Sequence, residues 1–239
     1  MLLLSALKRA PRAIRQKHLV VEQMQRIGLG SLPLVLVTSV FTGGVAAVQA
    51  AYQFQNYVPL RYLGMVIGKS VVIELGPVLT ALVVGGRVGA SIAAELGTMK
   101  VTEQIEALET LAIDPVRYLV SPRLIAAVVM LPVITVFSDF IAIMGGFAVA
   151  WAGLDINTHV YFNSIKVHLT TGDVLSGLVK AFFFGGIIAM MGCYHGMKTR
   201  GGAEGVGIAT TKAVVASCLL ILITDYILAS LLFSAVFAG

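Results

Sequence analysis

Residues 74–109 read ELGPVLTALVVGGRVGASIAAELGTMKVTEQIEALE, and the character of this stretch changes near its middle. Up to Ala94 it carries only two charges, on Glu74 and Arg87, whereas charged side chains recur from Glu95 onward. A helix of about 20 apolar residues crosses a bilayer core about 30 Å thick. The first part therefore predicts a membrane span, and the second part predicts a short helix outside the membrane.

Apolar segments of similar length lie on both sides of this stretch. Of the 239 residues, 58% are hydrophobic and only 12% are charged, about half the charged content of soluble domains, which excludes an ordinary water-soluble enzyme. We predict an all-α integral membrane protein in which residues 1–239 form a single domain with five transmembrane helices. The predicted spans are residues 32–55, 62–96, 119–152, 174–197 and 213–237.

Basic residues gather on one side of these spans. Short cytoplasmic loops are rich in Lys and Arg, so this distribution predicts a cytoplasmic amino terminus and, after five crossings, a carboxyl terminus outside. Residues 5–29 mix apolar and basic side chains, which predicts an interfacial amphipathic helix lying on anionic lipid. This anchoring accounts for the formal net charge of +5, and we expect no binding of nucleic acid.

Residues 98–113 are predicted to form a short cytoplasmic helix at the membrane surface. Thr102 is suited to cap it, and Pro115 is expected to end it at the preceding residue. An apolar face and an acidic face would let it contact a soluble partner, although a merely solvated acidic face remains the alternative. The apolar face holds Ile105, Leu108 and Ala112, and the acidic face holds Glu103, Glu106 and Thr110.

No sequence pattern predicts catalysis, a metal site or a cofactor. Residues 64–70, GMVIGKS, are one residue short of a phosphate-binding loop and fall in a predicted span. The four His and two Cys lack the spacing of metal sites or hydrolases. We therefore predict that this chain is not an enzyme.

Several charged residues fall within or at the ends of the predicted spans. A charge near the middle of a membrane helix costs about 2.5–3.5 kcal/mol on insertion scales and normally faces protein or a wet cavity. For the aspartates we expect structural hydrogen bonds or pairs between helices. The residues are Glu74, Arg87, Glu95, Asp139, Lys180 and Asp225.

Glu74 is the most informative of these charges because Pro77 follows it. Proline removes a backbone donor and can kink a helix, and a kink beside a carboxylate suits a polar pocket for a lipid headgroup. The alternative is a structural pair in which Lys69 or Arg61 neutralises Glu74. The sequence leaves both interpretations open.

Small residues recur at four-residue spacing, as in Gly85-x-x-x-Gly89-x-x-x-Ala93 and Gly185-x-x-x-Ala189. Lipid tails provide no hydrophobic driving force between helices, so helices associate where small residues let their backbones approach. These motifs predict tight helix pairing.

Residues 74–109, followed by IDPVRYLVSPR at 113–123, closely resemble the MlaE (YrbE-type) permease family of bacterial ABC phospholipid transporters associated with MCE proteins. The similarity continues in weaker form through Asp139, Gly145, the Thr210 region and Asp225, and so covers nearly the whole chain.

The resemblance implies a homodimeric permease in a bacterial inner membrane, with its carboxyl terminus in the periplasm. It implies that two cytoplasmic ABC ATPase subunits bind ATP and Mg, and that an MCE-domain protein covers the outward-facing cavity of the permease dimer. It also implies that phospholipid moves between the inner and outer membranes. Residues 98–113 would be the coupling helix. The implied ATPase-coupling residues are Glu95, Lys100, Glu103, Glu106 and Glu109. The implied lipid-binding residues at the dimer interface are Gln49, Gln53, Phe54, Tyr57, Glu74 and Leu75.

One departure from the family and two rival functions remain. Some relatives have Arg directly before the Glu-Leu-Gly-Pro motif, where this chain has Ile73, so Arg61 or Lys69 is the alternative basic contact for the lipid phosphate.

An ion-coupled carrier would use Glu74, Asp139 and Asp225 as a relay and would work without an ATPase. A non-transporting scaffold would bind no lipid.

Overall fold

The computed structural model describes residues 17–54 and 58–237, and every regular element within these ranges is a helix. Five helical segments are long and apolar enough to cross a membrane, which confirms the predicted all-α membrane fold. Each begins earlier than predicted, because the helices continue into polar flanks that hydropathy does not count as span. The segments are Lys17–Phe54, Leu60–Val101, Val116–Leu154, Thr171–Met197 and Gly202–Leu232.

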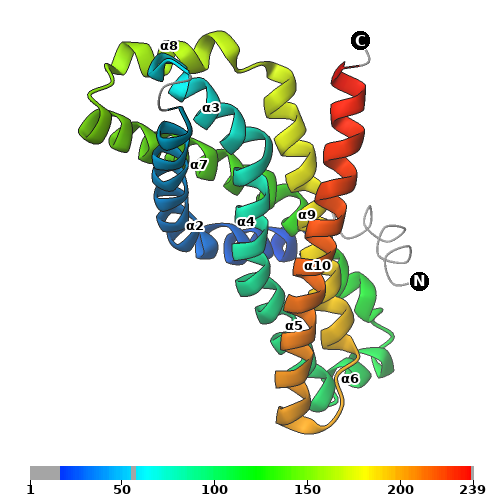
Figure 1. Cartoon of the computed structure of the whole chain (residues 1–239). Coiled ribbons are helices and arrows are strands. Elements are labelled where there is room, and N and C mark those ends of the chain that lie inside the picture. Colours follow the sequence, from blue (N-terminus) through cyan, green and yellow to red (C-terminus); the bar gives the residue numbers. More distant parts are fainter. Residues whose placement is uncertain (1–16, 55–57, 238–239) are drawn as a thin grey trace.

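The first segment is one continuous helix, α2 (Lys17–Phe54), where we had predicted an interfacial helix over 5–29 and a separate span over 32–55. Residues 5–16 of that prediction lie outside the described residues. Figure 1 shows that the first turns of α2 run across the bundle before the helix turns upward. Pro33 lies inside α2, where it removes a backbone hydrogen bond and permits such a bend.

The second segment is a helix interrupted by two wide π turns. It contains a short 3-10 turn η1 (Leu60–Tyr62), α3 (Leu63–Ser70), π turn η2 (Val71–Leu75), α4 (Gly76–Val84), π turn η3 (Gly85–Gly89) and α5 (Ala90–Val101). The embedded charges Glu74 and Arg87 lie in the two π turns. Pro77 has no N–H for the carbonyl of Ile73, and the amide of Gly76 instead donates to the oxygen of Val71, which produces the first wide turn.

The remaining helices complete an elongated bundle. They are α6 (Gln104–Thr110), π turn η4 (Val116–Val120) leading into α7 (Ser121–Leu154), α8 (Thr158–His168), α9 (Thr171–Met197) and α10 (Gly202–Phe237). In Figure 1, α6 lies at one end of the bundle and α8 at the other. The bundle therefore has two different end surfaces outside its apolar middle, one formed around α6 and the other around α8.

Helix α8 was not predicted from the sequence. The side chain of Asn157 caps it by accepting a hydrogen bond from the amide of His159. Tyr161 is fully buried, and its hydroxyl donates to the carbonyl oxygen of Ile143 at 3.1 Å. The helix also lies so close to α3 that a Cβ on Gly64 would be 2.3 Å from the oxygen of Tyr161. Helix α8 therefore covers the outer ends of α3 and α7.

Helices α2 and α7 approach each other through small residues. A Cβ on Gly43 would lie 1.7 Å from the carbonyl oxygen of Ala142, so only glycine fits there. The hydroxyls of Ser39 and Ser138 share a buried hydrogen bond of 2.8 Å across the same contact. Close backbone approach thus fixes the first span against the third.

The predicted pairing through the Gly89 and Ala93 motif is confirmed. A Cβ on Gly192 of α9 would lie 3.1 Å from the oxygen of Gly89, and a Cβ on Gly196 would lie 3.1 Å from the oxygen of Ala93. Gly185 of α9 approaches the Ala127 backbone of α7 in the same way. Helix α9 therefore holds the second and third spans together.

Candidate functional site

A buried cation joins three spans in the middle of the bundle. Lys180 of α9 is completely buried, and its ammonium group lies 2.5 Å from Glu74 Oε2 and 2.9 Å from Asp225 Oδ1. The contact with Glu74 is a hydrogen bond, whereas Asp225 lies at an ion-pair distance but outside hydrogen-bond geometry. Lys180 therefore links α9 electrostatically to π turn η2 through Glu74 and to α10 through Asp225.

The structure assigns Glu74 a different partner from those proposed in the sequence. Lys69 pairs with Asp173 at 3.4 Å, and Arg61 contacts the ring and hydroxyl of its neighbour Tyr62. The predicted pairing of Glu74 with Lys69 or Arg61 is therefore wrong, and Lys180 takes that place. This partner comes from a helix far along the chain, so local spacing gave no sign of it.

The two embedded aspartates differ in their surroundings. Asp225 has the interhelical ion pair with Lys180 that we expected for such a residue. Asp139 lies against the backbone of Gly76, where a Cβ would be 1.7 Å from its Oδ1, and that oxygen is buried without a hydrogen-bond partner. Within residues 17–54 and 58–237, no three His, Cys, Asp or Glu side chains are grouped so as to hold a metal ion.

The predicted lipid-binding residues are divided between two places. Gln49 lines an apolar groove of about 550 Å³ between α2 and α7, and Gln53 is exposed one turn further along α2, with Phe54 half-buried beside it. Glu74 and Leu75 lie in π turn η2, both half-buried. Tyr57 lies outside the described residues. The groove is lined by Val40, Phe41, Gly44, Val45, Val48, Gln49, Gly145, Ala148 and Val149.

The predicted coupling helix is shorter than 98–113. Helix α5 continues to Val101, and α6 ends at Thr110 because the chain turns into the left-handed region at Ala112, with φ of 56°. Thr102 does not cap α6, since its hydroxyl donates backward to the oxygen of Thr98. Asp114 accepts from the amides of Val116 and Arg117, so the Asp-Pro pair begins the next helix.

The two predicted faces of α6 are confirmed in part. Ile105 is buried and Leu108 packs against the core, but Ala112 is exposed beyond the helix end, so its place on the apolar face was wrong. Glu103 and Glu109 are exposed. Leu111 beside them is 69% exposed.

The other three predicted coupling residues bind within the chain. Glu106 pairs with Lys100, and the hydrogen bond from this ammonium group lowers the pKa of the carboxyl below its ordinary value of 4.5. Glu95 lies 2.9 Å from the buried Arg123 of α7 and 3.5 Å from Arg26 of α2. Glu95 therefore joins three helices, and the sequence gave no indication that Arg123 would be its partner.

Comparison with known proteins identifies the family. The model of the family described as Permease MlaE matches residues 20–231. The chain belongs to the MlaE permease family. A probable ABC transporter permease protein of Rickettsia typhi is 48% identical over 215 residues, which cover 90% of this chain and 83% of the relative.

Two further relatives of this MlaE-family chain carry more specific names. The intermembrane phospholipid transport system permease protein MlaE of Haemophilus influenzae is 35% identical over 238 residues, covering 98% of this chain and 90% of the relative. The chloroplastic protein TRIGALACTOSYLDIACYLGLYCEROL 1 of Arabidopsis thaliana is 38% identical over 213 residues, covering 89% of this chain and 61% of the relative. The resemblance stated from the sequence is thereby confirmed, and the chain is a multi-pass membrane permease.

Proposed function

We propose that this chain is the membrane subunit of an ATP-driven ABC transporter that moves glycerophospholipid between the inner and outer membranes of a bacterium. Two copies form the transport unit, a cytoplasmic ATPase hydrolyses ATP with Mg, and an MCE-domain protein receives or delivers lipid at the opposite face. The names of the Haemophilus influenzae and Rickettsia relatives support this assignment. The α6 end then faces the cytoplasm, in agreement with the distribution of basic residues.

The observation that carries the ATPase assignment is the surface around α6. Glu103, Glu109 and Leu111 are exposed there, beyond the apolar part of the bundle. Ile105 and the Glu106–Lys100 pair attach the same helix to the bundle and to α5. A partner that moves α6 would therefore move the second and third spans, which begin or end at this helix.

The test of this assignment measures coupling in the complete transporter complex. We expect Glu103→Arg with Glu109→Arg to lower lipid-stimulated ATPase activity about tenfold or more, because reversed charges oppose docking. Glu204→Arg is the matched control, since Glu204 is an exposed glutamate in the first turn of α10 at the same end. Unchanged coupling in the double variant would refute the docking role of α6.

The groove between α2 and α7 supports lipid as the substrate. Its lining is apolar along Val40, Val45 and Val48 and includes the polar side chain of Gln49, and Gln53 is exposed one turn further along α2, outside the groove. An apolar groove with one polar end matches the polarity of a glycerophospholipid whose headgroup lies toward the α8 end. Glu74 and Leu75 would complete the lipid site when a second copy closes the cavity.

The ion-coupled carrier remains the alternative function. Its relay would need Glu74, Asp139 and Asp225 to exchange protons, but Lys180 already bridges the first and last of these, and the buried Asp139 oxygen has no hydrogen-bond partner. Transport measurements on proteoliposomes that contain the permease alone distinguish the carrier from the ATP-driven transporter. Lipid or ion movement driven by an ion gradient without an ATPase would support the carrier and refute our proposal. A scaffold would bind no lipid at all.

A further inference from the structure

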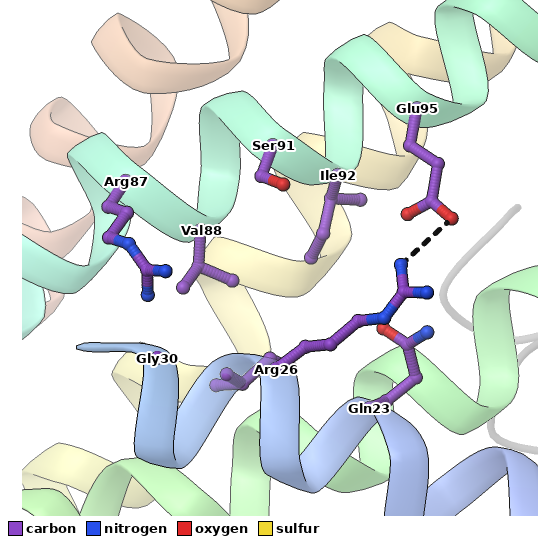
Figure 2. Close-up of a pocket in the computed structure, with 9 residues that line it drawn as sticks. Gln23, Arg26, Gly30, Arg87, Val88, Ser91, Ile92 and Glu95 are labelled. Carbon is purple, nitrogen blue, oxygen red and sulfur yellow. Dashed lines mark hydrogen bonds and ion pairs between the residues drawn. The ribbon is translucent and has the colours of Figure 1, made fainter. Parts of the chain in front are cut away.

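A second polar site lies between α2 and α5, separate from the apolar groove. It is a cavity of about 250 Å³, which we call the α2–α5 pocket. Figure 2 shows the side chains of Arg26 and Arg87 extending into the space between the two helices, with the hydroxyl of Ser91 above it. The pocket is lined by Gln23, Arg26, Ile27, Gly30, Arg87, Val88, Ser91, Ile92 and Glu95.

Arg87 supplies positive charge to this pocket that no acidic side chain balances in the part of the chain that the structure describes. Its guanidinium donates to the hydroxyl of Ser31 at 2.9 Å, and among the described residues no carboxylate lies within ion-pair distance of it. By contrast, Arg26 is bound by Glu22 at 2.8 Å and more loosely by Glu95. Arg87 is exposed, so the donors of its guanidinium that do not reach Ser31 are open to an anion or to water.

The charges around the pocket leave an excess of one positive charge. Arg26, Arg87 and Arg123 carry three positive charges, and the two carboxylates that pair with Arg26 and Arg123, Glu22 and Glu95, carry two negative charges. Arginine presents several N–H donors in one plane, which suits the oxygens of a phosphate group. The hydroxyl of Ser91 on α5 and the amide of Gln23 on α2 add neutral donors from the two opposite walls of the cavity.

The position of the pocket indicates where such a phosphate comes from. Ser31, which holds Arg87, belongs to the part of α2 that runs across the bundle just before Pro33. Figure 1 shows that α5 and α6 extend past this transverse part of α2. A helix that lies across the bundle with basic and apolar faces marks the headgroup level of a membrane. Arg87 is therefore placed at the lipid phosphates of the leaflet on the α6 side.

The walls of the pocket also fit a lipid. Ile27, Val88 and Ile92 lie among the polar groups, and they are buried apolar side chains. A free inorganic phosphate would gain nothing from them, whereas the glycerol and first methylenes of a lipid would pack against them. We propose that the α2–α5 pocket binds the phosphate of an anionic phospholipid from the leaflet on the α6 side, with Arg87 as the principal donor. This site does not depend on the proposed transport.

Lipid titrations of the full-length protein in neutral detergent test the proposal, with native mass spectrometry counting bound lipid. Dioleoylphosphatidylglycerol is the probe, and dioleoylglycerol, which has the same tails but no phosphate, is the lipid control. We expect Arg87→Ala to weaken phosphatidylglycerol binding about tenfold, the effect of losing a charged hydrogen bond. Lys212→Gln removes one positive charge at the same end outside the pocket, and it should bind like the wild type.

A second variant keeps the test decisive if Arg87→Ala does not fold. Ser91→Leu fills the pocket but leaves both arginines in place, so it should also weaken phosphatidylglycerol binding. Wild-type affinity in both variants would overturn the proposal. Equal binding of dioleoylglycerol would overturn the role of phosphate, and displacement of the lipid by an equal concentration of inorganic phosphate would overturn the assignment to a lipid.

Discussion

Lys180 Nζ lies 2.5 Å from Glu74 Oε2, so a completely buried cation meets a carboxylate whose side chain is 44% exposed. The pair connects the fourth span to the π turn of the second, and Asp225 adds the fifth span. A buried cation without partners would carry a large desolvation cost. The contact therefore fixes the relative positions of three helices near the proposed lipid site.

Removing the buried cation should strongly destabilise the protein. Lys180→Met leaves Glu74 and Asp225 facing each other without compensation, and we expect a loss of about 3 kcal/mol in the free energy of unfolding. Thermal unfolding in detergent measures it. Lys69→Gln is the control, because Lys69 pairs with Asp173 at a partly exposed site and should cost about 1 kcal/mol or less. Similar losses in both variants would contradict the central role of Lys180.

A larger side chain at Gly43 should separate α2 from α7. A Cβ there would lie 1.7 Å from the backbone oxygen of Ala142, and a backbone cannot move aside as a flexible side chain can. We expect Gly43→Val to destabilise the fold by about 3 kcal/mol. Gly153→Ala should change stability by about 1 kcal/mol at most, since no atom lies within 4 Å of a Cβ at that glycine. An undisturbed Gly43→Val protein would show that the two helices are not in close contact.

The attachment of α6 should weaken in acid. Because Lys100 lowers the pKa of Glu106 below 4.5, the native state favours the ionised carboxylate. The stabilisation is therefore present above about pH 4.5 and is lost as the pH falls through the lowered pKa. We expect Lys100→Met to have a lower thermal midpoint than the wild type at pH 7, and this difference should disappear as the pH falls through the lowered pKa of Glu106. A difference that persists in acid would exclude the ion pair as its cause.

Filling the apolar groove should block lipid transport without unfolding the chain. Gly44 lines the groove, and a tryptophan there would occupy the space between α2 and Val149. We expect Gly44→Trp to reduce lipid transport in reconstituted complexes about tenfold while the complex stays assembled. Val37→Trp is the matched control, because Val37 is exposed on α2 but does not line the groove. Normal transport by Gly44→Trp would remove the groove from the lipid path.

The sequence predicted the spans better than it predicted their contacts. The presence of five apolar segments that can cross a membrane and the pairing of Gly89 and Ala93 with a neighbouring helix were confirmed, because both depend on local composition. Helix α8 was missed because its eleven residues are too short and too polar for a hydropathy signal. The end of α6 was misplaced because Asp114 and Pro115 were taken to end one helix when they begin another.

By itself, the sequence determined that this chain is a five-span membrane protein of a recognisable permease family. Those conclusions depend on the length of apolar runs and on motifs within single segments, which the bilayer thickness and local backbone chemistry constrain directly. Only the tertiary structure decided that Lys180 neutralises Glu74, that Glu95 binds Arg123, and that Arg87 has no acidic partner within residues 17–54 and 58–237. Such partners come from helices far apart in the chain, and electrostatic pairing depends on distance in space rather than on spacing in sequence.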